Sequence, residues 1–166
     1  MVKRARIAAE VAGKAEFELP PELAADGDIG TIVADEQASM TARQNKLSLQ
    51  LKALVDLRAL LESDIGSLEK KKASQQSQLE LAEKEMSSVG SLADQGLVVN
   101  TRVIQVKKSI AEVQSSLLDI DTSILRARQD INKAGQDAIN FQNTHDSDLA
   151  IERQQVEAEL NETNLK

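Results

Sequence analysis

The stretch that decides the fold is VIQVKKSIAEVQSSLLDIDTSILRARQDINKAGQDAINF, residues 103–141. Apolar residues recur along it at alternating steps of three and four. The series comprises Val103, Val106, Ile110, Val113, Leu117, Ile120, Ile124, Ala127, Ile131, Ala134, Ala138 and Phe141. This spacing is the a/d seam of a heptad repeat, so it predicts a long helix that pairs with another helix. A half-buried strand would need alternation every two residues, and the stretch has none.

A second heptad series precedes the first along the chain. It comprises Met40, Gln44, Leu47, Leu51, Leu54, Arg58, Leu61, Ile65, Leu68, Lys72, Gln75, Leu79, Ala82, Met86 and Val89. Four of its positions are polar, and their long side chains can lie over small or apolar neighbours and still reach water. Beyond Phe141 the first series is interrupted at His145 and resumes in a shifted phase at Leu149. We therefore predict a stutter near residue 145.

The two series are joined by a short segment that predicts a tight turn. Gly96 suits a helix C-terminus with positive φ, and Asn100 or Thr101 suits the N-cap of the next helix. Helices joined by so few residues must be antiparallel neighbours. Facing seam positions should then have residue numbers that total about 195, because the turn centres on 96–99.

The remaining chain predicts smaller pieces before the hairpin. Residues 1–13 look like the end of a preceding helix that Gly13 stops, and we expect it beside the base of the hairpin. Residues 14–31, with the pair Pro20-Pro21, read as a connector. The predicted fold class is all-α: a long antiparallel two-helix coiled-coil hairpin with a short N-terminal helical remnant. Its parts are a first helix at 32–95, a tip turn at 96–100 and a second helix at 101–162.

Composition excludes several classes of function. Aromatic residues make up 1% of the chain. Because pockets for small ligands are commonly lined by aromatic side chains, this composition disfavours a ligand-binding pocket. The net charge of −7 disfavours nucleic acid as a partner, and the absence of cysteine excludes thiolate zinc sites. His145 is the only histidine, and Asp119 and Asp121 point away from the seam as solvated charges. We expect no catalytic, cofactor or metal site, and no apolar run approaches a membrane span.

The turn itself carries the feature that predicts a function. Leu97, Val98 and Val99 form a consecutive apolar run on a loop between two helices. One interpretation is that Leu97 folds back to plug the end of the seam. Three apolar residues are more than a plug needs, and an exposed apolar patch at the end of a hairpin favours docking to a partner.

These residues carry a resemblance to a known family. The segment FELPPEL at 17–23, the two heptad arms and the tip LADQGLVVNTRVIQVKKSIAEV at 92–113 resemble the α-helical hairpin of HlyD-type membrane fusion proteins. The run Gln95-Gly96-Leu97-Val98 and the run Asn100-Thr101-Arg102 match the tip of that family. Many adaptors also carry an Arg-Leu-Ser motif at the tip. Alignment on Gly96 places this motif at Ser88, Leu92 and Val99, so only Leu92 matches.

The resemblance implies a function, a location and partners. Such proteins are periplasmic adaptors of type I secretion systems that bridge an inner-membrane ABC transporter and a TolC-like outer-membrane channel. Their hairpins assemble side by side as hexamers. It implies a partner-docking tip made of Leu92, Gly96, Leu97, Val98, Val99, Asn100, Thr101 and Arg102. The family's membrane anchor, lipoyl-like domain and β-barrel domain are missing here, so the chain should be a soluble fragment that contacts the transporter through those parts.

Two other hypotheses stay open on the residues alone. One is a self-associating structural coiled coil without a transport role, which predicts strong oligomers of the isolated chain. The other is the helical arm of an enzyme or of a nucleic-acid-binding protein. The latter would need a basic face, and the charge balance argues against it.

Overall fold

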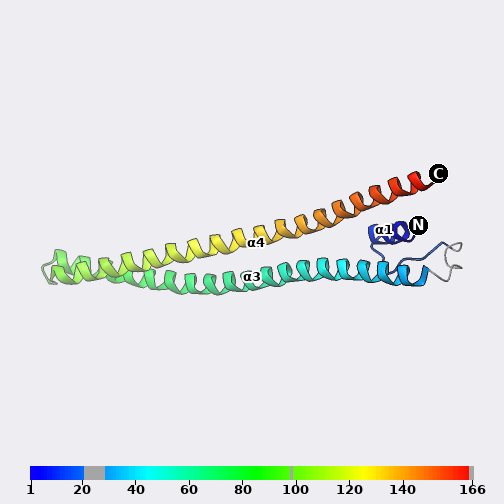
Figure 1. Cartoon of the computed structure of the whole chain (residues 1–166). Helices are drawn as coiled ribbons and strands as arrows, with labels where there is room; N and C mark the ends of the chain where they lie inside the picture. The colour runs from blue at the N-terminus through cyan, green and yellow to red at the C-terminus, as the bar shows by residue number, and fades with distance from the viewer. Residues whose placement is uncertain (21–28, 98, 165–166) are drawn as a thin grey trace. The chain divides into compact units, whose positions relative to one another are not determined.

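The computed structural model describes residues 1–20, 29–97 and 99–164. Its regular elements within these ranges are three helices, α1 (Val2–Val11), α3 (Gly30–Asp94) and α4 (Asn100–Asn164) (Figure 1). The two long helices have 65 residues each. The predicted all-α class and the hairpin of two long helices are therefore confirmed. Val98 of the predicted tip and residues 21–28 of the predicted connector lie outside the described residues.

The chain forms two compact units, which we call the central unit (residues 56–134) and the terminal unit (residues 1–55 and 135–166). The central unit consists of parts of α3 and α4 that pair along the predicted seam. Its buried apolar side chains all belong to the heptad series of α4: Val106, Ile120, Ile124, Ala127 and Ala134. The facing positions of α3 are half-buried, as expected for a pair of helices that buries one stripe each.

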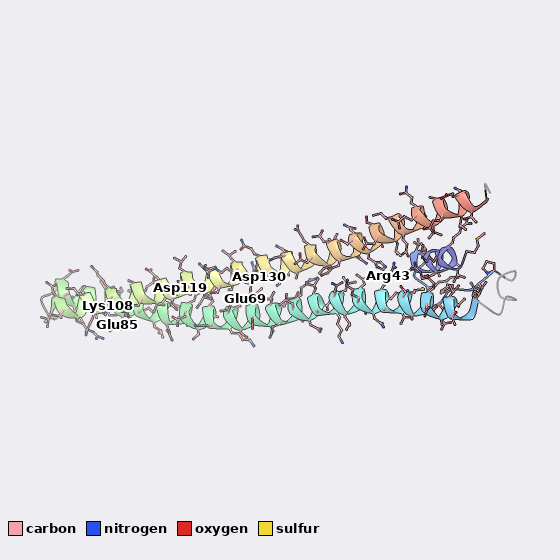
Figure 2. All side chains as sticks on the ribbon, in the orientation of Figure 1. Arg43, Glu69, Glu85, Lys108, Asp119 and Asp130 are labelled. Atoms are coloured by element: carbon pink, nitrogen blue, oxygen red, sulfur yellow. The ribbon has the colours of Figure 1, made fainter. Side chains whose placement is uncertain are left out.

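Two ion pairs fix the register of the central unit. Lys72 Nζ lies 2.6 Å from Asp121 Oδ1, and Arg128 Nη2 lies 3.5 Å from Glu69 Oε1. The residue numbers of these pairs total 193 and 197, which brackets the predicted 195. The side chains of α3 and α4, among them the labelled Glu69 and Asp119, are drawn along the pair in Figure 2. The two helices of this unit are antiparallel neighbours in the predicted alignment.

The terminal unit is a packing of three helices rather than two. Here α1 lies between the first turns of α3 and the last turns of α4, as Figure 1 shows. Each of the three helices contributes buried apolar side chains to this unit: Ile7 of α1, Met40 of α3, and Leu149 and Val156 of α4. The expected place of the N-terminal helix beside the base of the hairpin is thus observed.

The third helix explains the phase shift near residue 145. In the central unit α4 buries residues at alternating steps of three and four. Over residues 145–160 of α4 the side chains withdrawn from water are His145, Leu149, Glu152, Val156 and Leu160, at steps of four, three, four and four, while Asp148 is exposed. A helix that faces two neighbours must bury a broader face than one that faces a single partner.

Candidate functional site: the hairpin tip

The turn between α3 and α4 is a Schellman motif centred on Gly96. The Gly96 amide donates to the Ala93 carbonyl at 2.9 Å, and the Leu97 amide donates to the Leu92 carbonyl at 2.9 Å. Gly96 has φ +74°, a conformation that L side chains rarely adopt. A Cβ at this position would meet nothing within 4 Å, so glycine is favoured here by the backbone and not by space. The motif ends α3, and the chain enters the loop at Leu97.

The apolar tip residues are open to water. Leu97 is 69% exposed, Val99 is 76% exposed and Leu92 is 41% exposed. The interpretation that Leu97 folds back to plug the seam is therefore wrong, because a side chain that plugged the seam would be buried. Ile104, which is 64% exposed, is one turn further along α4 and adds to the apolar surface at this end. Sequence reasoning missed Ile104, although its place one residue after a seam position signals an outward side chain.

The polar residues predicted at the tip lie in the first turn of α4. Asn100 is the first residue of that helix, and the Arg102 amide donates to the Val99 carbonyl at 2.9 Å. The Arg102 guanidinium forms an ion pair with Glu85 of α3. Both side chains are about half exposed, so the pair ties the two helices together only weakly. Thr101 is exposed beside it.

Ser88 occupies the position where adaptors of the resembling family carry arginine. Its hydroxyl donates to the Lys84 carbonyl at 3.2 Å, so its polar atom is turned onto its own helix. Leu97 and Val99 are the most exposed large apolar side chains described at this end. Burial of these apolar side chains against a partner would favour docking, and this contribution to binding does not require charged residues on the partner.

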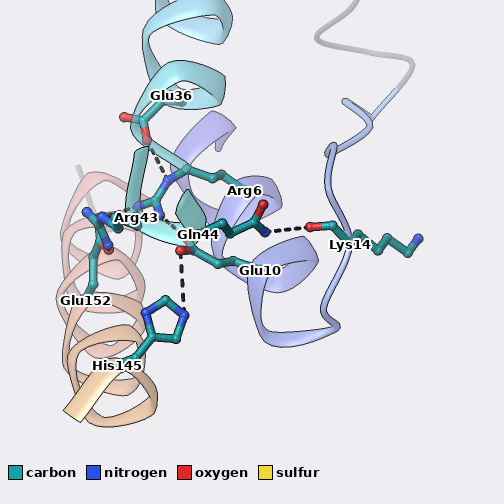
Figure 3. A network of polar contacts seen from close by, with 8 residues as sticks. All are labelled: Arg6, Glu10, Lys14, Glu36, Arg43, Gln44, His145 and Glu152. Carbon is teal, nitrogen blue, oxygen red and sulfur yellow. Dashed lines mark hydrogen bonds and ion pairs between the residues drawn. The ribbon is translucent and has the colours of Figure 1, made fainter. Parts of the chain in front are cut away.

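A second polar cluster, which sequence reasoning missed, lies in the terminal unit (Figure 3). Arg6 of α1 is completely buried and contacts three carboxylates. Its Nε donates to Glu36 Oε2 at 2.7 Å, and its Nη1 donates to Glu10 Oε2 at 2.7 Å. Its Nη2 donates to Glu152 of α4, which also accepts a 2.6 Å hydrogen bond from Arg43 Nη1. One guanidinium thus joins α1, α3 and α4.

The cluster is held by charge as well as by hydrogen bonds. Burial by itself would raise the pKa of Glu152, but the hydrogen bonds and charges of Arg43 and Arg6 outweigh it and hold that pKa below its usual value. Glu10 Oε1 is buried without a hydrogen-bond partner, and His145 Nε2 lies 3.9 Å away from it. We interpret the cluster as a structural clamp on α1.

The chain that follows α1 is also fastened to α3. Gly13, with φ +69°, ends α1 in a second Schellman motif, in which the Lys14 amide donates to the Ala9 carbonyl at 2.9 Å. Gln44 Nε2 then donates to the Lys14 carbonyl at 2.8 Å, and Gln37 Nε2 donates to the Ala15 carbonyl at 2.9 Å. These bonds orient the start of the connector along the first turns of α3.

Neither a metal site nor a membrane span is found in the part of the chain that the structure describes. No cluster of three or more histidine, aspartate or glutamate side chains in these residues is arranged to hold a metal ion. None of the described helices combines the length and the apolar character that crossing a membrane requires.

Comparison with known proteins gives three findings. The whole chain, residues 1–166, matches the family described as "AprE, long alpha-helical hairpin". The exopolysaccharide production protein ExoF of Rhizobium meliloti (strain 1021) is 43% identical over 166 residues, which are 100% of this chain and 39% of ExoF. The crystal structure of the soluble domain of LipC, a membrane fusion protein of a type I secretion system, matches with a TM-score of 0.86 at 20% identity. That match covers 99% of this chain and 64% of the LipC chain.

Proposed function

The chain belongs to the AprE long α-helical hairpin family, and from this premise we propose that it is the hairpin of a periplasmic membrane fusion protein. In this proposal the hairpin is the part of an adaptor that reaches an outer-membrane channel. The relatives support it, because ExoF acts in exopolysaccharide production and LipC is a membrane fusion protein of a type I secretion system. The chain spans 39% of ExoF and 64% of the LipC chain, so a longer protein would supply the other functions of the adaptor.

The observation that carries the proposal is the exposed apolar tip. Leu97 and Val99 project from the turn that joins α3 and α4, and the Schellman motif at Gly96 holds that turn in place. Leu97 and Val99 face water in this chain. Covering each of them with a partner would contribute about 1.5–3 kcal/mol to the free energy of binding. A role in docking explains why they stand at the turn.

An adaptor of this kind has one partner at each end. The tip docks to a TolC-like outer-membrane channel, and the parts of the longer protein outside this chain contact an inner-membrane ABC transporter. The hairpins stand side by side in the periplasm as a hexamer. Catalysis has no part in this role, which consists of holding two membrane complexes together.

The proposal is tested by measuring the binding of the hairpin to the TolC-like channel encoded in the same genome. We expect the double substitution Leu97→Asp with Val99→Asp to weaken binding by about 30-fold or more, because each change puts a charge into a desolvated contact. The measurement is the dissociation constant on immobilised channel, with far-UV circular dichroism to show that helix content is unchanged.

Leu49→Asp is the matched control for this test. Leu49 lies on α3 within the terminal unit and is 68% exposed, almost the same as Leu97. The control should bind the channel like the unaltered chain. Equal binding by the tip variant and the unaltered chain would show that docking does not use the apolar turn.

The exported material has a second candidate besides protein. ExoF, which is 43% identical to this chain, is named for exopolysaccharide production, and this favours a polysaccharide as the cargo of the longer protein. Deletion of the gene that carries this hairpin should then lower secreted polysaccharide and leave the secreted proteins unchanged. The reverse pattern would assign the cargo to protein.

A further inference from the structure

One oxygen of the buried cluster in the terminal unit has no hydrogen-bond donor. Glu10 Oε2 accepts from Arg6 Nη1 at 2.7 Å, but Glu10 Oε1 is buried without a hydrogen-bond partner. The side chain of Glu10 is completely withdrawn from water. Unsatisfied buried acceptors are rare in folded proteins because they are unfavourable, most of all when they are charged. A proton donor that reached this oxygen would therefore stabilise the packing of α1.

The cluster also carries an excess of negative charge. Its two cations are the guanidiniums of Arg6 and Arg43, and its three anions are the carboxylates of Glu10, Glu36 and Glu152. Two positive charges against three negative charges leave one negative charge uncompensated among these residues. A third cation beside Glu10 would balance the cluster.

His145, the only histidine of the chain, lies beside the unpaired oxygen (Figure 3). His145 Nε2 is 3.9 Å from Glu10 Oε1, and the side chain of His145 is 20% exposed. This distance is too long for a hydrogen bond, and a shift of the imidazole by about 1 Å would close it. Protonation makes both ring nitrogens donors and gives the ring a positive charge. A protonated His145 would thus supply both the donor and the charge that the cluster lacks.

The other charged groups that face His145 are paired or exposed. From α3, Arg43 and Lys46 line the same cavity as the imidazole and oppose its protonation. Arg43 is paired with Glu152, however, and Lys46 is exposed, so the opposing charge is partly neutralised and partly screened by water. Three charged residues of α4 line the cavities beside the imidazole and are all exposed: Asp146, Asp148 and Arg153. Glu10 is therefore the carboxylate from which protonated His145 gains most.

We propose that His145 is a pH-sensitive latch for α1, in which the protonated imidazole pairs with Glu10 and fastens α1 to α4. Imidazole is the side chain that changes its charge between about pH 5 and about pH 8. Docked α1 places a carboxylate beside the ring, whereas released α1 does not. The latch should therefore hold α1 more firmly as the pH falls through this range and less firmly as the pH rises. This inference concerns the terminal unit alone and does not depend on the proposed role of the tip.

Hydrogen exchange of the whole chain at about pH 5.5 and at about pH 8 tests the latch. The exchange rates of the Ile7 and Ala9 amides are divided by those of an unstructured peptide at the same pH, which removes the intrinsic effect of pH on exchange. We expect about 5-fold greater protection at the lower pH, because the new contact is a charge-assisted hydrogen bond. Burial raises the pKa of Glu152, but Arg43 and Arg6 outweigh it and hold that pKa below its usual value, so Glu152 stays ionised at both pH values.

Three variants separate the contact with Glu10 from its alternatives. His145→Gln keeps a donor that cannot gain a charge, and Glu10→Gln removes the carboxylate. In both variants the protection of α1 should be the same at the two pH values. Asp148→Asn removes an exposed carboxylate that lines the same cavity as His145, and it should keep the full pH dependence. His145→Gln leaves every contact of Arg6 in place, so it decides the question even if Glu10→Gln releases α1.

Equal protection of the unaltered chain at the two pH values would overturn the latch. A pH dependence that survives in His145→Gln would overturn it as well, because the titrating group would then lie elsewhere. Loss of the pH dependence in Asp148→Asn would show that the imidazole pairs within α4, and Glu10 would no longer be its partner.

Discussion

Arg6→Met is expected to release α1 from the terminal unit. The substitution keeps the length of the side chain but removes the buried charge that Glu10, Glu36 and Glu152 share. Removal of one partner from a buried ion pair costs about 3–5 kcal/mol, because the remaining charges lose their compensation. A helix of 10 residues is unstable alone, so α1 should unfold once it is released. Hydrogen exchange at the Ile7 and Ala9 amides should accelerate by about 100-fold or more.

Arg4→Met is the matched control for the release of α1. Arg4 lies on the same helix and is exposed, so its replacement should change exchange only slightly. Equal acceleration in the two variants would contradict the role of the Arg6 cluster. Acid supplies a second readout. The pKa of Glu152 is lowered in the folded state, so its contribution to stability is present above the unfolded pKa and is lost as the pH falls through the folded value.

Ile124→Asp is expected to separate the two helices of the central unit. Ile124 is 6% exposed and lies in the middle of the seam, where a carboxylate would have little access to water. The substitution combines the loss of apolar burial with the cost of a buried charge, for a total of about 3–5 kcal/mol. Helices of this unit bury one stripe each, so the seam has few other contacts to offset that loss. Thermal unfolding followed by far-UV circular dichroism should show an earlier transition.

Leu125→Asp is the matched control for the seam. Leu125 is the next residue along the chain and is 60% exposed, so the same charge remains in water. Its effect on the free energy of unfolding should stay within about 0.5 kcal/mol. Equal destabilisation by the two substitutions would show that the heptad seam is not what holds α3 against α4.

The hairpin could be predicted from the sequence because its determinants are local. The apolar residues of 103–141 repeat with the period of a helix pair, and Gly96 alone has the freedom that the turn requires. The antiparallel register then follows from the length of the connection, as the pairs Lys72–Asp121 and Arg128–Glu69 show. The heptad repeat, the glycine at the turn and the short connection can each be read from residues that are close together in the sequence.

The terminal unit could not be predicted in the same detail because its contacts are distant in sequence. The bond from Arg6 to Glu152 joins residues 146 positions apart, and nothing around either residue distinguishes it from an exposed charge. The heptad spacing shows the phase shift at His145, but it does not indicate that a third helix lies beside α4 there. At the tip the sequence identified Leu97 and Val99, whereas their exposure depends on the direction that the chain takes after Gly96.

The central claim is that the apolar turn of this hairpin contacts an outer-membrane channel, and site-specific photocrosslinking tests it most directly. A photoreactive residue is placed at position 97 or at position 49, in cells that express the longer protein that carries this hairpin. Position 97 should crosslink to the periplasmic end of a TolC-like channel, and position 49, which is equally exposed, should not. Crosslinks to the channel from position 49 but not from position 97 would contradict it.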